Sequence, residues 1–352
     1  SSLSEYGKVK PRKNSTKNQN FDHVSSSNKT EVDKREELNH HSKVELKELS
    51  PVMRHYVELK KDNKDRILLY RLGDFFECFF EDAIRLSQIL ELTLTGKEAG
   101  KNIGRVPMAG IPHHAAERYC AALIQKGLSI AICDQLESAS NKEGKIIKRD
   151  ITRIFTPGTI IEEGMLNAKK NNWLASVYLE NNDFNEFVKW GLACADISTG
   201  EFLVIDGEGI KMLEQELTKL DISEIICEET YKNKLKNYLQ VNIEFTSIFK
   251  TNFSYHESVS SIESYFKIDT LSGLSLKNKE LCIRSSGGLI SYLEQTKLNK
   301  VCLDFPQIFN RKNSLIIDSQ TRRNLEINST QKDGEYQGSF LWAIDNSLTA
   351  MG

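Results

Sequence analysis

The sequence predicts a mixed α/β protein with two compact domains followed by a helical part. Three observations support this class. Short apolar strands alternate with amphipathic helices from about residue 50 to residue 137, apolar or alternating runs separated by turns follow between 172 and 206, and helical patterns dominate after 257. At about 150 residues per domain, the chain is long enough for two domains and part of a third.

The first 43 residues are rich in Asn, Ser, Lys and His and contain almost no apolar residues. We predict a disordered polar tail over 1–43, because such a composition buries too little apolar surface to offset the entropy of ordering. Order is expected in a first domain over 44–150. Its first helix begins at Ser50 and Pro51, since Ser can cap a helix and Pro fits its first turn.

The remaining elements follow from periodicity and turn signals. In the first domain RILLYRL is a strand, DAIRLSQILE a helix, LTLT a strand, GKEAGKNIGR a basic Gly-rich loop, HAAERYCAALIQKG a helix and SIAICDQ a strand. In a second α/β domain over 151–256, NWLASVYLE and FVKWGLACADISTGEFLVID form an antiparallel meander, IKMLEQELTKL a helix and SEIICEE a strand. Residues 257–352 are predicted to start an all-helical part, where Gly287 and Gly288 indicate close helix packing.

Composition excludes several protein classes. The chain is 39% hydrophobic and 27% charged, with a net charge of -2, so attraction to nucleic acid requires a local basic surface. No apolar run approaches the roughly 18 residues of a membrane span, and there is no signal-peptide core. We therefore expect no membrane partner and a cytoplasmic, most simply bacterial, protein. The seven cysteines are spaced singly, which favours buried reduced thiols. Because the chain starts with Ser and stops in mid-pattern after SFLWAIDN, we expect a fragment.

The stretch GDFFECFF places four phenylalanines directly after a turn signal. In one interpretation it is a strand-to-helix turn whose rings all enter the core. In the other, strand alternation turns Phe76 and one of the last two phenylalanines inward and leaves Phe75 and Glu77 together on the opposite face. A large ring beside a carboxylate is an unusual surface. The residues alone leave both interpretations open.

Longer segments carry a family resemblance. ILLYRLGDFFECFFEDA, VPMAGIPHHAAERYCAALIQKGLSIAICDQLE, RIFTPGT, ADISTGEF and IIDSQTRRNLEI occur in this order and together resemble the MutS family of DNA mismatch repair proteins. The resemblance runs from about Ser50 to Gly352 and does not cover the tail. It implies a mixed-sheet α/β mismatch-binding domain over 44–150, an RNase H-like α/β connector over 151–256 and the start of an all-α lever domain over 257–352.

The resemblance also implies a recognition motif. In this family the Phe of a Phe-x-Glu motif stacks on a mispaired base from the minor groove, and the Glu forms a hydrogen bond with that base. By position the motif falls on Phe75 and Glu77, with Phe76 where the family commonly has Tyr. The implied function is therefore DNA mismatch binding, with Phe75 as the wedge and Glu77 as the base contact.

Basic residues near the motif are candidates for contacts to the DNA backbone. Lys97, Lys101 and Arg105 lie in the predicted loop and are candidate phosphate contacts, and Met108 is a candidate groove contact. For each of these charges the alternative is an ordinary solvated loop. A second basic stretch that includes Arg149 is interpreted as a solvated strand face.

The family resemblance extends to cofactors and partners. Family members are ATPases that use ATP and Mg²⁺, but their G-x-x-x-x-G-K-[ST] loop does not occur in this chain. We therefore expect no catalytic residue, cofactor or metal site here. The implied partners are mismatched double-stranded DNA, a MutL-type repair protein and a second copy bound through C-terminal domains of the family, in a nucleoid-associated setting.

Two other functions remain open. Asp196 lies on a predicted strand before Ser/Thr-Gly, as in the opening strand of RNase H-like nucleases. Two-metal chemistry needs several converging carboxylates, whereas Glu224, Glu228 and Glu229 are expected at the surface. The other alternative is a MutS-like recombination or scaffold paralogue that does not read mismatches. Such relatives generally lack the Phe-x-Glu pair.

Overall fold

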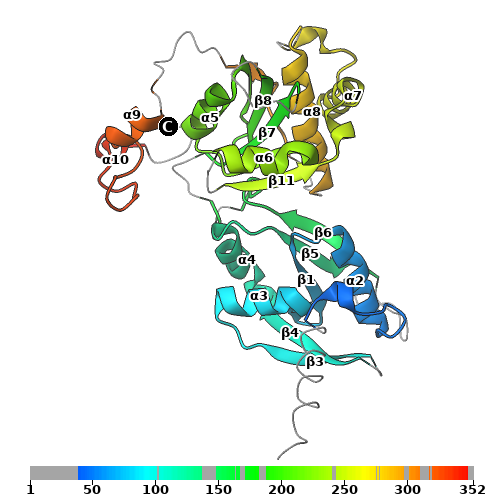
Figure 1. Ribbon diagram of the computed structural model, residues 1–352. Helices are drawn as coiled ribbons and strands as arrows, with labels where there is room; N and C mark the ends of the chain where they lie inside the picture. Colours follow the sequence, from blue (N-terminus) through cyan, green and yellow to red (C-terminus); the bar gives the residue numbers. More distant parts are fainter. Residues whose placement is uncertain are drawn as a thin grey trace, which may run out of the picture.

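The structure is a computed structural model in which two α/β bodies each contain a six-stranded sheet (Figure 1). Both sheets combine parallel and antiparallel neighbours, which confirms the predicted mixed α/β class. The structure describes residues 39–100, 103–136, 148–162, 164–166, 171–181, 188–239, 243–274, 276, 278–296, 301–309, 317 and 319–347.

The first sheet has the strand order β3-β4-β2-β1-β5-β6. Strands β1 and β5 run parallel, and the other neighbouring pairs run antiparallel. Helix α2 packs on one face, and α3 and α4 pack on the other. The elements are η1 (His41–Lys43), α2 (Pro51–Asp62), β1 (Ile67–Leu72), β2 (Phe75–Phe79), α3 (Phe80–Leu90), β3 (Thr95–Gly100), β4 (Gly104–Pro112), η2 (His113–Ala115), α4 (Ala116–Gln125), β5 (Ile130–Gln135) and β6 (Arg149–Phe155).

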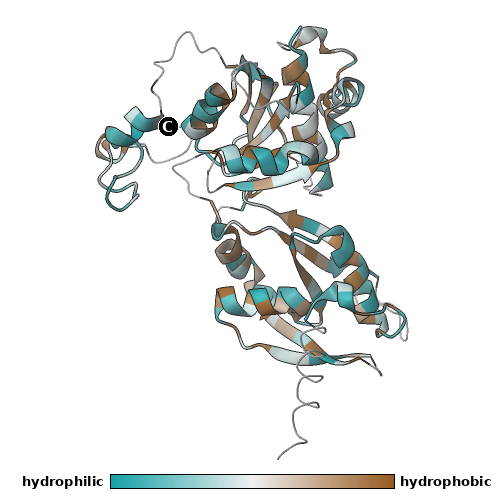
Figure 2. Cartoon of the chain, in the orientation of Figure 1, coloured by the Kyte–Doolittle hydropathy of each residue, from teal (hydrophilic) through white to brown (hydrophobic). Residues whose placement is uncertain are grey.

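Strand β1 shows how the two cores of this domain arise from sequence alternation. Leu68 and Tyr70 belong to the cluster under α2, whereas Ile67 and Leu69 belong to the cluster under α3 and α4. Figure 2 shows apolar residues along the strands and polar residues on the outward sides of the helices. A period of two with apolar residues in both phases is the pattern of a strand covered on both faces.

Strand β2 ends in a tight reversal into α3. Phe79 and Phe80 are both fully buried, and Phe80 adopts a φ of 56°, in the left-handed region that non-glycine residues rarely occupy. The Tyr56 hydroxyl of α2 accepts a hydrogen bond from the Phe79 N–H at 3.2 Å and donates one to Asp82 at 3.0 Å. Lys60 pairs with Asp82 at 2.8 Å. This buried cluster fixes the point at which strand becomes helix.

Three predictions for the first domain are corrected. Strand β6 pairs with β5, so the domain extends beyond residue 150. The segment GKEAGKNIGR is not a plain loop, because it supplies most of β3 and the start of β4. The edge strand was not predicted because glycine is rare in strands. Most of the predicted tail, 1–38, lies outside the described residues, but residues 39–43 are ordered, since His41 is buried against Glu81 with its N–H donating to the carboxylate at 3.0 Å.

The second sheet has the order β11-β10-β7-β8-β9-β12. The predicted meander is confirmed as antiparallel β7, β8 and β9, and β10 joins parallel between β7 and β11. Helices α5 and α6 cover one face, and α7 and α8 the other. The elements are β7 (Trp173–Leu179), β8 (Lys189–Asp196), β9 (Phe202–Glu208), α5 (Ile210–Leu220), β10 (Glu224–Glu228), α6 (Glu229–Leu239), β11 (Glu244–Ile248), η4 (Lys250–Phe253), α7 (Tyr255–Phe266), η5 (Leu271–Gly273), α8 (Glu280–Gln295) and β12 (Gln307–Ile308).

The predicted start of a separate helical part at residue 257 is wrong. Helices α7 and α8 share a core with the second sheet, because their apolar residues pack against β7, β8 and β9. The prediction of close packing at Gly287 and Gly288 is confirmed: a Cβ would meet the Ser258 side chain at 2.3 Å and the Phe253 ring at 2.3 Å, respectively. Two further short helices follow, α9 (Ser319–Asn324) and α10 (Phe340–Ile344).

The junction between the two domains is organised by the carboxylate of Glu224, at the start of β10. This side chain was expected at the surface but is fully buried. Thr156 Oγ1 and the Gly158 N–H donate to one oxygen at 2.6 Å and 3.0 Å. Thr246 Oγ1 and the Tyr292 hydroxyl donate to the other, each at 2.7 Å. The turn that leaves the first domain is thereby held to the second sheet and to α8.

Candidate nucleic-acid interface

Phe75 and Glu77 lie side by side on one face of β2. Phe75 is opposite Pro112 and Glu77 is opposite Gly110 on β4, so both side chains project to the same side of the sheet. Phe75 is 47% exposed, whereas Phe76 between them is 4% exposed and belongs to the core under α3 and α4. The interpretation in which all four phenylalanines enter the core is therefore wrong, and the placement of Phe75 and Glu77 on one face, opposite to Phe76, is confirmed. Phe79 lies on the same face as Phe75 but is buried under α2.

The same face continues across β4 to the edge strand β3. Met108 of β4 is opposite both Phe79 and Thr95, and Val106 is opposite Lys97. Residues that are directly opposite in an antiparallel pair share a face. Lys97 and half-buried Met108 therefore lie on the face that carries Phe75 and Glu77, as a candidate contact surface requires.

Lys97 is not free in the solvent but forms an ion pair with Glu77. Its ammonium donates to Glu77 Oε2, and it also lies 5.6 Å from the centroid of the Phe79 ring. The Glu77 side chain is 16% exposed and the Lys97 side chain 36%. The residue predicted as a phosphate contact therefore touches the residue predicted as the base contact.

The other two predicted backbone contacts are not part of this arrangement. Arg105 is opposite Glu98, one position out of phase with Val106, so its side chain lies on the other face of the sheet. There its guanidinium donates to the Gly96 carbonyl. Lys101 lies outside the described residues.

On the far side of Glu77 the face is extended by Tyr70 and Arg149. Tyr70 is directly opposite Glu77, and its hydroxyl lies 2.9 Å from His55 Nδ1. Burial raises the pKa of the Tyr70 hydroxyl to about 12, with the Cys133 thiol adding to the shift and the Arg149 guanidinium opposing it. That guanidinium lies 5.6 Å from the Tyr70 ring centroid. Sequence reasoning assigned Arg149 to a solvated strand face, and no local signal links it to Glu77, three strands away.

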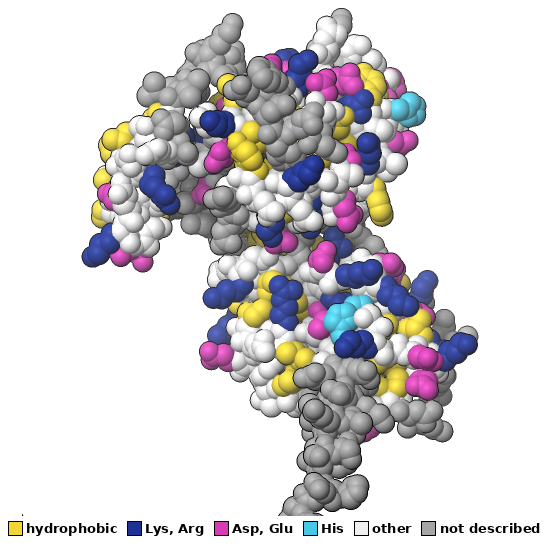
Figure 3. Space-filling view, viewed as in Figure 1, with side chains coloured by type: hydrophobic (Ala, Val, Ile, Leu, Met, Phe, Trp, Pro, Cys, Tyr) yellow, Lys and Arg dark blue, Asp and Glu magenta, His cyan; other side chains and the backbone are white. Residues whose placement is uncertain are grey.

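The face therefore carries a cation on each side of an aromatic ring and a carboxylate. Figure 3 shows that Lys and Arg side chains elsewhere on the visible surface are interspersed with Asp and Glu rather than gathered in one basic field. This distribution agrees with the net charge of -2. Any contact with a polyanion must then rely on local placement of charge.

The geometry does not support a nuclease site at Asp196. This carboxylate is fully buried and closes its own turn, accepting from the Ser198 N–H at 2.9 Å, the Ser198 hydroxyl at 2.7 Å and the Asn172 N–H at 3.0 Å. Glu224 is used at the domain junction, and Glu228 accepts from the Thr230 hydroxyl at 2.6 Å. Two-metal chemistry requires carboxylates that converge on the ions, and these three do not.

Among the described residues, His40, His41 and Glu81 form the only group with spacing that suits a metal ion. Their polar atoms already have partners, since His40 Nδ1 lies 2.9 Å from the Ser42 hydroxyl and His41 Nδ1 lies 2.5 Å from Glu81. The cluster attaches the segment before α2 to α3. It is a structural tie rather than an open ligand set.

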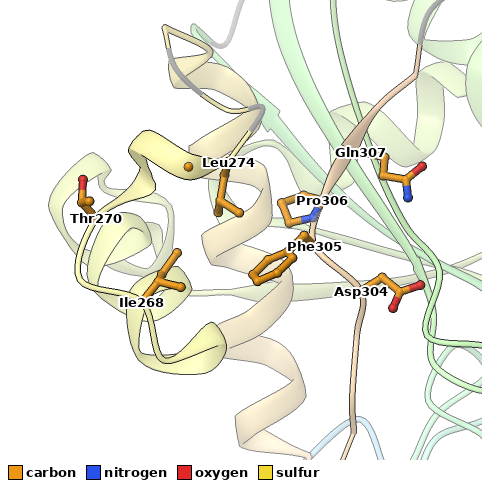
Figure 4. A pocket seen from close by; sticks show the side chains of 8 residues that line it. Ile268, Thr270, Leu274, Asp304, Phe305, Pro306 and Gln307 are labelled. Atoms are coloured by element: carbon orange, nitrogen blue, oxygen red, sulfur yellow. The ribbon is translucent and has the colours of Figure 1, made fainter.

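A separate pocket of about 570 Å³ lies in the second domain, between the segment after α7 and the segment before β12 (Figure 4). Ile268, Leu274 and Phe305 supply apolar walls, and Asp304 points away from them. Apolar walls with few convergent polar groups give no basis for catalysis. The pocket belongs to the second domain, whereas the Phe75 face belongs to the first.

Comparison with known proteins agrees with the fold. Residues 50–164 match the family model MutS domain I, and residues 172–308 match MutS domain II. The DNA mismatch repair protein MutS of Prochlorococcus marinus strain SARG is 60% identical over 330 residues, covering 91% of this chain and 36% of that protein. The protein of the same name from Synechococcus sp. strain CC9311 is 52% identical over 322 residues, covering 89% and 35%.

Fold and matches together define a tandem of two α/β domains, one of the mismatch-binding type and one of the connector type. The chain belongs to the MutS family and carries its domains I and II. It spans about a third of the length of these curated relatives. Within the described residues, no helix has the length and apolar character needed to cross a bilayer.

Proposed function

We propose that this chain recognises mispaired or unpaired bases in duplex DNA as part of DNA mismatch repair. The observation that supports this most is the exposed ring of Phe75 beside Glu77, in a strand whose other phenylalanines are buried. An apolar ring held at the open end of a rigid sheet is suited to insertion between stacked bases. The printed names of the relatives, DNA mismatch repair protein MutS, agree with this proposal.

The proposed wedge discriminates through the deformability of the duplex. Inserting a ring between base pairs costs a few kcal/mol of stacking and kinks the DNA. Stacking of a base on an aromatic side chain returns about 1–3 kcal/mol for any base. A mispaired base has already lost part of its pairing and stacking, so the cost of insertion falls while the gain from Phe75 stays. A sensor of this kind reads weak points rather than sequence.

Glu77 adds a chemical test to the mechanical one. At a mismatch its carboxylate can accept a hydrogen bond from a displaced base N–H, or donate one when it is protonated. At a matched pair that partner is missing, and the carboxylate faces a polyanion. Glu77 therefore disfavours matched DNA more than it favours any particular mismatch.

The surrounding face would supply contacts to the rest of the duplex. We propose phosphate contacts for Lys97 and Arg149, which lie on either side of Glu77, and an apolar groove contact for Met108. Lys101 and Arg105 stay proposals as backbone contacts, and Arg105 needs to leave the Gly96 carbonyl to serve as one. A scaffold protein that does not read mismatches has no use for an exposed wedge, so the proposal favours mismatch reading.

The remaining family functions are proposed for the whole protein rather than for these two domains. They are ATP and Mg²⁺ binding, docking of a MutL-type repair protein, and pairing with a second copy, in a bacterial cytoplasm and on its nucleoid. The connector domain is held to the first domain through Glu224 and the 156–158 turn. That junction is the route by which a DNA-bound state would reach the rest of the protein.

A binding titration tests the proposal. A labelled duplex with one G·T mismatch and its matched homoduplex are titrated at fixed salt, with this chain and with a chimera in which it replaces the matching N-terminal part of the Prochlorococcus marinus strain SARG protein. Phe75→Ala is expected to reduce mismatch binding roughly 5- to 150-fold and to abolish the preference. The matched control is Phe249→Ala, at an exposed ring in the second domain. Equal binding of both duplexes, indifferent to Phe75→Ala, overturns the proposal.

A further inference from the structure

The partner of Glu77 comes from a strand that is not its neighbour. Strand β4 lies between β2 and β3, so the Lys97 side chain must cross β4 to reach Glu77 Oε2. The position on β4 directly opposite Glu77 is Gly110, where a Cβ would already touch Glu77 Cγ at 3.5 Å. The missing side chain leaves room for the carboxylate and for the approaching ammonium.

The Glu77 carboxylate is only half used. Within the described part of the chain, Lys97 is its one hydrogen-bond donor and occupies Oε2. The other oxygen, Oε1, accepts no hydrogen bond from the described residues. It is also not one of the side-chain polar atoms that are fully buried without a partner. A base N–H can therefore approach Glu77 on the side away from Lys97.

Moving the Lys97 ammonium away from Glu77 is unfavourable unless another donor takes its place on the carboxylate. The Glu77 side chain is 16% exposed, and a largely desolvated carboxylate that loses the one cation it contacts among the described residues is strongly destabilised. The unfavourable state becomes worse beside DNA phosphates. A second donor, such as the N–H of a displaced base, removes this obstacle. The flexible four-carbon stem of a lysine then allows its ammonium to turn to a phosphate.

We infer that Lys97 is a specificity-determining residue that exchanges partners: it stays on Glu77 over matched DNA and moves to a phosphate when a mispaired base takes over the carboxylate. The exchange makes one phosphate contact conditional on the mismatch. This inference rests on the proposed function. It assigns to Lys97 a role beyond that of a permanent backbone contact.

The dependence of binding on salt tests the exchange. Each phosphate neutralised by a cation contributes about -0.9 to the slope of log Kobs against log salt on B-form DNA. The slopes are measured for the G·T duplex and the homoduplex with the chimera. For Lys97→Met, the mismatch slope is expected to become shallower by about 0.9 and the homoduplex slope to stay unchanged. For Glu77→Gln, which releases Lys97, the homoduplex slope is expected to steepen by about 0.9.

Controls separate this result from general effects. Lys211→Met removes an exposed lysine of α5 in the second domain and is expected to change neither slope. Lys97→Gln repeats the test with a polar side chain if Lys97→Met fails to fold, as judged by its thermal unfolding. An equal change of both slopes for Lys97→Met means a permanent phosphate contact and overturns the inference. No change of either slope means a fixed structural ion pair and overturns it as well.

The two proposals fail in different ways. If the unsubstituted protein binds both duplexes equally, the proposed function fails and the exchange fails with it. If it prefers the mismatch and Phe75→Ala abolishes that preference, while Lys97→Met affects both slopes equally, only the exchange fails.

Discussion

Two glutamates on neighbouring domains, Glu77 and Glu224, show how differently a strand carboxylate can be used. Glu224 is fully buried and both of its oxygens accept two hydrogen bonds. Glu77 has one partner, a lysine that reaches across a strand, and one oxygen without a donor among the described residues. A carboxylate saturated by the protein holds the fold together, whereas one that is half satisfied beside an exposed ring is available to a ligand.

The largest expected effect tests the saturated member of this pair. Glu224→Ala removes the acceptor of four donors, three of them buried and Thr246 half-buried, and each buried donor left unsatisfied costs about 1–3 kcal/mol. We expect the free energy of unfolding to fall by more than about 4 kcal/mol. Urea unfolding followed by the fluorescence of the buried Trp173 and Trp190 measures it. Exposed Glu229→Gln, at the first residue of α6 directly after the same strand, serves as control. A loss for Glu224→Ala as small as that of the control would break the comparison.

The next effect concerns the C-terminal end of β2, the strand that carries Phe75 and Glu77. Tyr56→Phe removes the hydroxyl that binds both Asp82 and the Phe79 N–H. Because one partner is a carboxylate, we expect a loss of about 1.5–3 kcal/mol in unfolding free energy. Thermal unfolding checks this against Tyr119→Phe, at a half-buried ring of α4 for which no hydrogen bond is found among the described residues. Equal losses for the two variants would mean that Tyr56 contributes through its ring alone.

A smaller effect depends on pH. Burial alone would raise the pKa of the Glu81 carboxyl, but hydrogen bonds from His41 outweigh it and the pKa lies below its ordinary value. Such a group stabilises the fold above its unfolded pKa of about 4.3, and the contribution disappears as pH falls through the lower folded value. Near neutral pH, Glu81→Gln is expected to cost about 1 kcal/mol.

The measurement is thermal unfolding of Glu81→Gln and of the unsubstituted chain between about pH 3 and 7. The difference between them is expected to vanish at the acid end. Exposed Glu117→Gln on α4 is the control. A difference that stays constant across this range would show that the carboxylate charge is not what holds His41.

The smallest expected effect tests whether the Phe75 side chain contributes to the stability of the fold. Phe75 is 47% exposed, so Phe75→Ala should change the free energy of unfolding by less than about 0.5 kcal/mol. Its neighbour Phe76 is 4% exposed, and Phe76→Ala should cost about 3–5 kcal/mol. Urea unfolding of the two variants gives the contrast. Similar losses of unfolding free energy for the two variants would mean that Phe75 is a core residue.

Local patterns predicted the parts of the fold that depend on neighbouring residues. The meander of β7 to β9, helix α5 and the close approach at Gly287 and Gly288 follow from periodicity and turns. The outward pairing of Phe75 and Glu77 was one of two open interpretations, because alternation fixes a relative phase but not which phase faces the core. The family resemblance then pointed to the correct one.

Features that depend on distant partners could not be predicted in this way. Lys97 was placed in a loop, and its contact with Glu77 requires knowing that β4 lies between their two strands. Glu224 was expected at the surface, since none of its four donors lies near it in sequence. The helical patterns after 257 were recognised, but a helical pattern does not say which sheet a helix covers.

The left-handed backbone at Phe80 has a consequence for the length of the recognition strand. It ends β2 at a fixed residue, where Tyr56 and Asp82 clamp the reversal. Phe75 and Glu77 each lie an odd number of residues before Phe80, so the position of this stop determines which face of the sheet they occupy. Adding or deleting a single residue between Glu77 and Phe80 would turn both side chains to the opposite face, into the core under α3 and α4, and bring Phe76 out in their place. Recognition at this surface therefore tolerates exchanges of residue type far better than it tolerates a change in spacing.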